Sequence, residues 1–104
     1  WVSPVLPTGK DCCDATQLAA IRGPMDTAVA EAKRLGYPVF IGEFGAYSKA
    51  PLDARVRYLK AFRSLAAERG LPWMYWELAS GFGVYDPVAH AFRPEIYSAL
   101  YDSL

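Results

Sequence analysis

Two carboxylates directly follow short apolar segments and are the residues best placed for chemistry. Glu43 follows residues 39–41 and Gly42, and Glu77 follows residues 73–76. Active sites of parallel α/β proteins lie at the carboxyl ends of strands, and an ionisable group beside a buried strand is costly unless paired or functional. Each Glu could instead be a salt-bridge or capping group. Position favours a functional role for Glu43 and leaves the two interpretations equal for Glu77.

Aromatic side chains gather around the same positions, namely Trp73, Tyr75, Trp76, Phe82 and Tyr85. Sugar rings present flat apolar C–H faces on which aromatic rings stack, although core packing is the commoner use of such residues. Alternation along a strand would point Trp76 and Glu77 to opposite faces. We expect Trp76 and Phe82 to contact a ligand. Tyr47 could bind a sugar or Glu43, and a position at the rim explains it equally.

The remaining reactive residue types predict no cofactor and no metal site. His90 is the only histidine, and it has no partner at metal-ligand spacing. Cys12 and Cys13 are adjacent, and because a vicinal disulfide requires unusual geometry, two free thiols are expected. No Ser/His/Asp elbow, phosphate loop or CxxC pair is present.

Composition narrows the class of protein. The 104 residues are 53% hydrophobic and 21% charged, which is typical of a globular domain. Eleven basic and eleven acidic side chains cancel, which gives no electrostatic basis for binding nucleic acid or an anionic membrane. The sequence contains no apolar run of about 18 residues or more, the length that would predict a membrane span. The chain opens on Trp1 without a signal-like segment, so we expect a processed product or a fragment.

Helices and strands alternate in the pattern that would position these residues. Residues 1–14 are expected to form a loop, and Gly36 and Gly70 suit helix ends. The predicted helices carry an apolar face and cover residues 15–35 with an interruption at Gly23 and Pro24, residues 52–69, and the segment from Pro94 onward. The predicted strands are residues 39–41 and 73–76, and residues 80–87 are predicted to be a loop.

The spacing of the two strands predicts an incomplete parallel sheet. Residues 39–72 have the length of one βαβ unit, about 30 residues. Two parallel strands alone would keep unpaired hydrophobic edges and too little cover. The fold class is therefore α/β, as one part of a (β/α)8 barrel or of a doubly wound sheet. No glycine fingerprint supports dinucleotide binding.

Two segments resemble motifs of glycoside hydrolase family 5, the cellulase family. Residues 38–47 (PVFIGEFGAY) are similar to the motif of its seventh strand. Residues 73–78 (WMYWEL) with 80–87 (SGFGVYDP) are similar to the motif of its eighth strand. Residues 1–7 look like the loop after its sixth strand. The resemblance covers nearly the whole chain, with both motifs at the family's separation.

The resemblance implies a partial (β/α)8 (TIM) barrel. Residues 1–104 would be one part of a single catalytic domain, from the sixth helix through the seventh strand and helix to the eighth strand and helix. The family hydrolyses β-linked glucans or mannans with retention. Glu43 matches its nucleophile and Trp76 its sugar-binding tryptophan, while Glu77 matches no catalytic position. The acid/base Glu belongs to the fourth strand, so the isolated chain would be inactive.

Partners and location follow from the same resemblance. We expect a β-glucan substrate, no cofactor, secretion, and completion by the missing N-terminal barrel segment or by self-association. Two alternatives remain. The chain could be a non-catalytic assembly or domain-swapped fragment, or a different α/β hydrolase that uses Glu43 and Glu77 as a pair.

Overall fold

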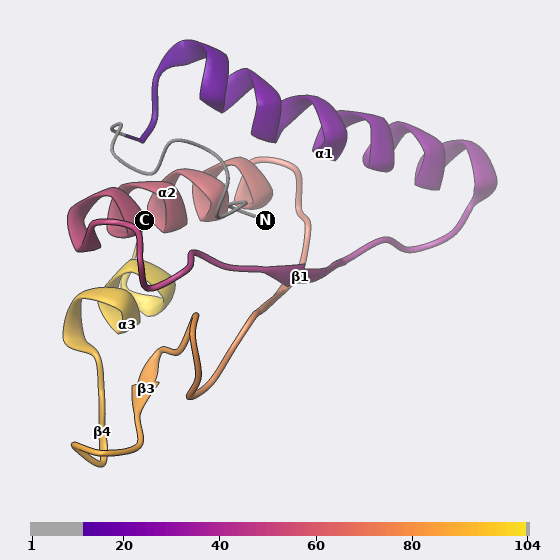
Figure 1. Cartoon of the computed structure of the whole chain (residues 1–104). Helices are drawn as coiled ribbons and strands as arrows, with labels where there is room; N and C mark the ends of the chain where they lie inside the picture. Colours follow the sequence, from indigo (N-terminus) through magenta and orange to yellow (C-terminus); the bar gives the residue numbers. More distant parts are fainter. Residues whose placement is uncertain (1–11, 104) are drawn as a thin grey trace.

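The computed structural model describes residues 12–103 of the chain. Its elements are, in order, α1 (Ala15–Leu35), β1 (Ile41–Phe44), α2 (Leu52–Ala67), β2 (Trp73–Tyr75), β3 (Tyr85–Asp86), β4 (Ala91–Phe92) and α3 (Pro94–Tyr101) (Figure 1). The first eleven residues of the expected N-terminal loop lie outside the described residues, as does the whole segment that resembles the loop after the sixth strand. No helix within residues 12–103 is long and apolar enough to cross a membrane.

Strands β1 and β2 pair in parallel, with Ile41 opposite Trp73 and Phe44 opposite Tyr75. Helix α2 connects them, so the predicted βαβ unit is confirmed. The boundaries differ: β1 begins at Ile41 rather than at residue 39, and β2 ends at Tyr75 rather than at residue 76. The apolar run at residues 39–41 identified the segment, but pairing with β2 decides which residues form the strand.

Helix α1 begins where the sequence supplies a reciprocal cap. The Gln17 backbone N–H donates to the Asp14 carboxylate and the Asp14 N–H donates to the Gln17 side chain, each at 2.8 Å. Gly36 ends the helix with φ of 72°, as predicted. The predicted interruption at Gly23 and Pro24 is wrong, because the helix continues through Pro24. A proline inside a helix removes one hydrogen bond, and tertiary packing of α1 on α2 outweighs that loss.

Replacing Asp14 by Ala is expected to lower the free energy of unfolding by about 1 kcal/mol, the usual value of an N-cap side chain. Urea denaturation followed by far-UV circular dichroism measures the change. Asp14→Asn is the matched control, since Asn also accepts from the helix N–H groups and should keep most of the stability. Equal losses in the two variants would contradict a capping role.

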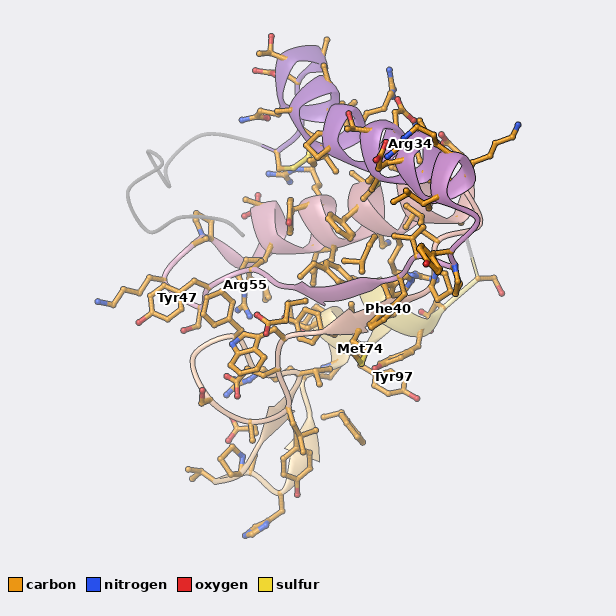
Figure 2. All side chains as sticks on the ribbon, turned by 90° about the vertical axis from the view of Figure 1, so that its right-hand side faces the viewer. Arg34, Phe40, Tyr47, Arg55, Met74 and Tyr97 are labelled. Carbon is orange, nitrogen blue, oxygen red and sulfur yellow. A yellow bond between two sulfur atoms is a disulfide. The ribbon has the colours of Figure 1, made fainter. Side chains whose placement is uncertain are left out.

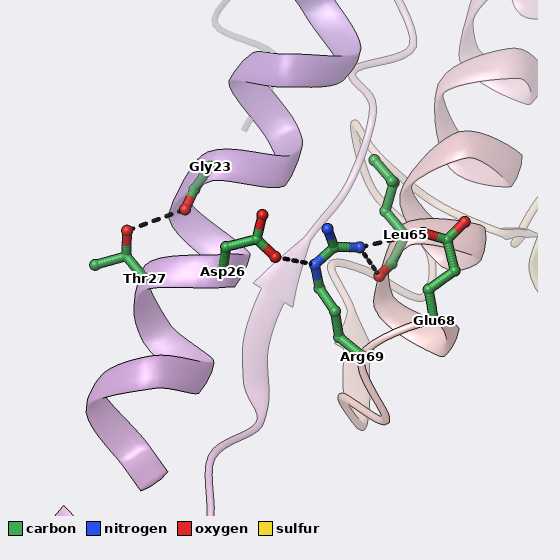
Figure 3. A network of polar contacts seen from close by, with 6 residues as sticks. All are labelled: Gly23, Asp26, Thr27, Leu65, Glu68 and Arg69. Atoms are coloured by element: carbon green, nitrogen blue, oxygen red, sulfur yellow. Dashed lines mark hydrogen bonds and ion pairs between the residues drawn. The ribbon is translucent and has the colours of Figure 1, made fainter. Parts of the chain in front are cut away.

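Packing of α1 on α2 forms the first of two hydrophobic clusters, made of Met25, Leu65, Ala66 and Leu71. At the edge of this contact, Arg69 Nε donates to Asp26 Oδ1 at 2.6 Å and Arg69 Nη1 donates to the Leu65 carbonyl at 2.9 Å (Figure 3). An exposed ion pair adds little to stability. The Arg69 contacts therefore orient α1 on α2, while the apolar side chains supply most of the energy.

The second cluster lies between the parallel strands and helices α2 and α3, and it consists of Phe44, Ala46, Leu59, Val84, Ile96, Ala99 and Leu100. Phe44 is its centre at 1% exposure, stacked on Phe62 with ring centroids 4.1 Å apart and edge-on to Trp73 and Tyr75. The predicted inner face of the last helix is thereby confirmed. Helices α1 and α2 lie on one side of β1 in Figure 1.

Two further predictions about the C-terminal half need correction. Helix α2 ends at Ala67, two residues before the predicted end, although Gly70 adopts the expected left-handed conformation with φ of 62°. The predicted loop at residues 80–87 contains strand β3, which pairs antiparallel with β4. Asp86 stabilises this hairpin, since its side chain accepts from the Val88 and Ala89 N–H groups and pairs with Arg93 at 3.0 Å. Two-residue strands are too short to produce a sequence pattern.

The expectation of two free thiols is also wrong. Cys12 and Cys13 form a disulfide, with their Cα atoms 3.0 Å apart. The general rarity of vicinal disulfides suggested otherwise, but here the local backbone brings the two sulfur atoms together. No free cysteine remains among residues 12–103.

Candidate active site

Glu43 lies within β1, not after it as predicted. Between Ile41 and Phe44 the strand advances three residues while β2 advances two, which is the register of a β-bulge at Gly42 and Glu43. The bulge explains why both Ile41 and Phe44 pack against the helix-side core. Bulges redirect side chains and are frequent beside active sites. Glu43 is accordingly exposed, while its neighbour Phe44 is buried.

In the part of the chain that the structure describes, the sheet face opposite the core is open. Trp73 and Tyr75 pack on the core side, so alternation along β2 places Met74 and Trp76 on the other side, where they are 54% and 50% exposed. The Trp76 backbone N–H donates to the Phe44 carbonyl at 2.7 Å, which ties Trp76 to the residue after Glu43. Glu43 and Trp76 thus share the uncovered side of the sheet at the carboxyl ends of the two strands.

Glu77 organises the loop that follows β2. Its Oε1 accepts from the backbone N–H groups of Ser80 at 3.1 Å and Phe82 at 3.2 Å, and from the Ser80 hydroxyl. The Ser80 hydroxyl and these N–H groups hold the pKa of the Glu77 carboxyl below its ordinary value. A general acid needs the opposite shift, toward a higher pKa. The bonding of Glu77 is therefore that of a structural carboxylate.

The pKa of Glu77 makes the order of its loop depend on pH. Because the folded-state pKa is below the ordinary value of 4.5, the stabilisation is complete above pH 4.5 and is lost as pH falls through the folded value. In an NMR titration, the amide signals of Ser80 and Phe82 should shift together with a midpoint below 4.5. Glu77→Gln should abolish this titration, and a midpoint at or above 4.5 would contradict the assignment.

The loop after β1 and the loop after β2 lie against each other. The rings of Tyr47 and Phe82 are 5.1 Å apart between centroids, and the Ser48 N–H donates to the Gly81 carbonyl at 2.8 Å. A Cβ at Gly81 would approach the Tyr47 ring to 2.7 Å, so the absence of a side chain permits this contact. Tyr47 and Phe82, both half-buried, thus form one aromatic surface from two loops.

Two further residues shape this site, and sequence reasoning missed only Arg55. The glycines on either side of Glu43 suggested a close approach of backbone or ligand, and Gly45 indeed approaches the Trp76 backbone so closely that a Cβ would lie 2.1 Å from the Trp76 carbonyl oxygen. Arg55 is buried on α2, and its Nε donates to the Ala46 carbonyl at 3.2 Å. Arg55 had a detectable signal, since it lies four residues before Leu59 and seven before Phe62, on the apolar face of the helix. His90 lies in the exposed turn between β3 and β4.

The arrangement provides an exposed carboxylate, an exposed indole and a pair of aromatic rings at one end of a parallel sheet. These groups suit attack on, or stabilisation of, a neutral ligand with apolar faces. Within the described part of the chain, no group of three His, Cys, Asp or Glu side chains could hold a metal ion.

Comparison with known proteins agrees with this geometry. Residues 6–81 match the family model "Cellulase (glycosyl hydrolase family 5)". Twenty-nine solved chains match. No curated protein matches.

Three of the matching structures illustrate the likeness. A structure described as an endoglucanase is 35% identical at a TM-score of 0.84, over 99% of this chain and 34% of that one. A hyperthermophilic endo-β-1,4-glucanase in complex with substrate is 40% identical at 0.79, over 96% and 33%. Thermotoga maritima Cel5A in complex with mannotriose is 29% identical at 0.82, over 90% and 30%. The chain thus spans about a third of the length of these structures.

Proposed function

Because the chain belongs to glycosyl hydrolase family 5, the cellulase family, we propose that it forms the last third of an endoglucanase barrel and supplies its nucleophile, Glu43. The observation that carries the proposal is the bulge in β1. It exposes Glu43 on the uncovered face of a parallel sheet, the face that points inward in a barrel, and Trp76 lies on the same face. Residues 1–104 then belong to one catalytic domain, from its sixth helix to its eighth.

In the proposed mechanism, Glu43 attacks the anomeric carbon of a β-1,4-linked glucan and forms a glycosyl-enzyme intermediate. A second carboxylate about 5–5.5 Å away protonates the leaving oxygen and then activates water, which releases the sugar with retained configuration. Glu77 does not fill this second role, because its Oε1 is held by Ser80 and Phe82 and its pKa is lowered. The acid/base carboxylate therefore comes from a strand outside these residues, and the chain alone is inactive.

Substrate binding is assigned to the aromatic side chains of the site. Trp76 is half-exposed beside Glu43 and would stack on the sugar next to the cleaved bond. Tyr47 and Phe82 form a second surface along the same edge. Two similar structures are complexes with an endoglucanase substrate and with mannotriose, so both a glucan and a mannan are appropriate test ligands. Secretion belongs to the same proposal, because polymeric glucan cannot enter cells.

The partner in this proposal is the remainder of the barrel. Within residues 12–103 the β1–β2 sheet has two strands, so the outer edge of each lacks a neighbouring strand there. Exposed apolar side chains are a second feature that calls for a partner. Phe40 and Met74, near the end of the sheet away from Tyr47 in Figure 2, are 60% and 54% exposed. On α3, Tyr97 and Tyr101 are 41% and 53% exposed beside its buried face. An apolar surface of this extent requires cover.

Completion of the barrel by a separate fragment tests the proposed function. The purified chain would be mixed with the remaining strands of Thermotoga maritima Cel5A, and hydrolysis of carboxymethylcellulose and of a mannan would be measured. The mixture should be active, each component inactive, and the first product detected by ¹H NMR should be the β-anomer. Hydrolysis by the chain alone, or an initial α-anomer, would contradict the proposal.

Self-association is the second candidate, favoured by the same unpaired edges. In that case copies of the chain would cover one another's sheets without forming a catalytic site. Size-exclusion chromatography of the chain alone distinguishes the outcomes. A concentration-dependent oligomer that is not dissociated by the Cel5A fragment would favour self-association, and a well-folded 11.5 kDa monomer would contradict the argument from edges.

A further inference from the structure

Arg55 is the only charged side chain that the fold buries within residues 12–103, with 6% of its surface exposed. It lies on the core-facing side of α2, one turn before Leu59. A buried guanidinium is costly unless its donors are satisfied, and an apolar side chain would fill the same volume without that cost. Arg55 therefore points to a role beyond filling space.

The contacts of Arg55 converge on Ala46, three residues after Glu43. Arg55 Nε donates to the Ala46 carbonyl at 3.2 Å, while Arg55 Nη2 has no hydrogen-bond acceptor within the described residues. Burial lowers the pKa of Arg55, and interaction with the Tyr75 hydroxyl offsets part of that shift. The hydrogen bond of this buried guanidinium to Ala46 thus restrains the backbone of the loop after β1.

Tyr75 acts on the second loop, which follows β2. Its hydroxyl donates to the Phe82 carbonyl at 2.6 Å, across the loop that follows β2. Burial raises the pKa of Tyr75, and the positive charge of Arg55 offsets part of that shift. Arg55 thus restrains the loop after β1 at the Ala46 carbonyl, while Tyr75 restrains the loop after β2 at the Phe82 carbonyl.

The residues that depend on these restraints form the aromatic surface. Tyr47 follows Ala46 directly, and its ring lies 5.1 Å from that of Phe82. Figure 2 shows Tyr47 and Arg55 at the same end of the molecule. A shift of the backbone at Ala46 or at Phe82 would separate the two rings, because Ala46 precedes Tyr47 directly and Phe82 carries the other ring.

We propose that Arg55 and Tyr75 are positioning residues that clamp the two loops, one at the Ala46 carbonyl and the other at the Phe82 carbonyl, and so hold the Tyr47–Phe82 ring pair in place for a sugar ring. The sugar-binding part rests on the proposed function, whereas the clamp itself does not. Neither residue touches the substrate. Their loss should weaken binding of substrate and transition state alike, which raises KM and leaves kcat unchanged.

The clamp is tested first in the 104-residue chain, without any activity measurement. NMR would follow the nuclear Overhauser contacts between the Tyr47 and Phe82 rings in Tyr75→Phe and Arg55→Gln. Tyr75→Phe removes only the hydroxyl and keeps the ring against Phe44. Lys60→Gln, an exposed position on the same helix, is the matched control.

We expect the ring contacts to be lost in Tyr75→Phe and in Arg55→Gln and retained in Lys60→Gln, with helical circular dichroism unchanged in all three. The double variant should show the same loss of ring contacts, since displacement of either loop already separates the two rings. If Arg55→Gln does not fold, Tyr75→Phe alone decides the question. Retention of the ring contacts in Tyr75→Phe would overturn the proposal.

The functional consequence is measured in the completed barrel with cellotetraose. Tyr75→Phe should raise KM about fivefold to tenfold, the effect of one lost hydrogen bond, with kcat unchanged. A fall in kcat at constant KM would overturn the assigned role. If the barrel shows no activity at all, the proposed function fails, and the ring contacts in the isolated chain still decide the clamp.

Discussion

Replacing Glu43 by Gln is expected to reduce hydrolysis of carboxymethylcellulose by the completed barrel by about 10³-fold or more. A nucleophile carries the chemistry of both steps, and its removal leaves only binding and electrostatic stabilisation. Glutamine keeps the size of the side chain, and position 43 is exposed in the isolated chain, so the fold should be unaffected. Initial rates at saturating substrate, with circular dichroism of each variant, measure the effect.

A small anion distinguishes a nucleophile from a carboxylate that only stabilises charge. In Glu43→Ala, azide has room to attack the anomeric carbon of a nitrophenyl cellobioside. The C–N bond forms as the C–O bond to nitrophenolate breaks, and this leaving group needs no proton. We expect azide to restore release of nitrophenolate and to give a glycosyl azide of α-configuration. A β-configured azide, or no acceleration, would contradict the nucleophilic role.

Glu77→Gln is the matched control for the carboxylate. Its hydrogen bonds organise a loop, so we expect a smaller loss than for Glu43→Gln and an effect mainly on KM. Equal losses in the two variants would instead favour a catalytic pair of Glu43 and Glu77. That outcome would support the alternative of a different α/β hydrolase.

The architecture could be predicted because it depends on periodicity and spacing. The apolar face of residues 52–69 and the spacing of two apolar runs that begin at residues 39 and 73 predict a βαβ unit without any knowledge of neighbours. The placement of Glu43 could not be predicted in the same way. A bulge is a property of two paired strands, and nothing in residues 39–44 reveals that Ile41 and Phe44 face the same side.

Other differences have equally specific causes. Pro24 disfavours a helix by local propensity, yet α1 continues because its packing on α2 compensates for the lost hydrogen bond. Contacts between residues far apart in the sequence cannot be recognised from a local pattern. Arg55 is buried although arginine is mostly exposed in proteins, since the Ala46 carbonyl that it binds lies nine residues earlier in the chain. The structural role of Glu77 could not be predicted, because its hydrogen-bond donors at Ser80 and Phe82 come within reach only when the loop at residues 78–82 is folded.

Replacing Gly45 by Ala is expected to lower the free energy of unfolding by about 3 kcal/mol, at the upper end of the range for overpacking. The added Cβ would lie 2.1 Å from the Trp76 carbonyl oxygen and 3.1 Å from the Phe82 ring. The nearer contact is a backbone atom, so a change of rotamer cannot relieve it. Either β1 and β2 separate at this point or Trp76 moves, and both changes disturb the site.

Gly42→Ala is the matched control, because it adds the same methyl group three residues away in the chain. A Cβ at Gly42 would meet only the Phe40 ring at 3.9 Å, an ordinary contact. Neither glycine has a positive φ, so the two variants differ in steric contact and not in backbone strain. Urea denaturation of the isolated chain should show a large loss for Gly45→Ala and little change for Gly42→Ala. Similar midpoints for the two variants would mean that the loop at Gly45 can move away from Trp76. In that case, the close approach of the two strand ends would not be the contact that positions Trp76 on the same face as Glu43.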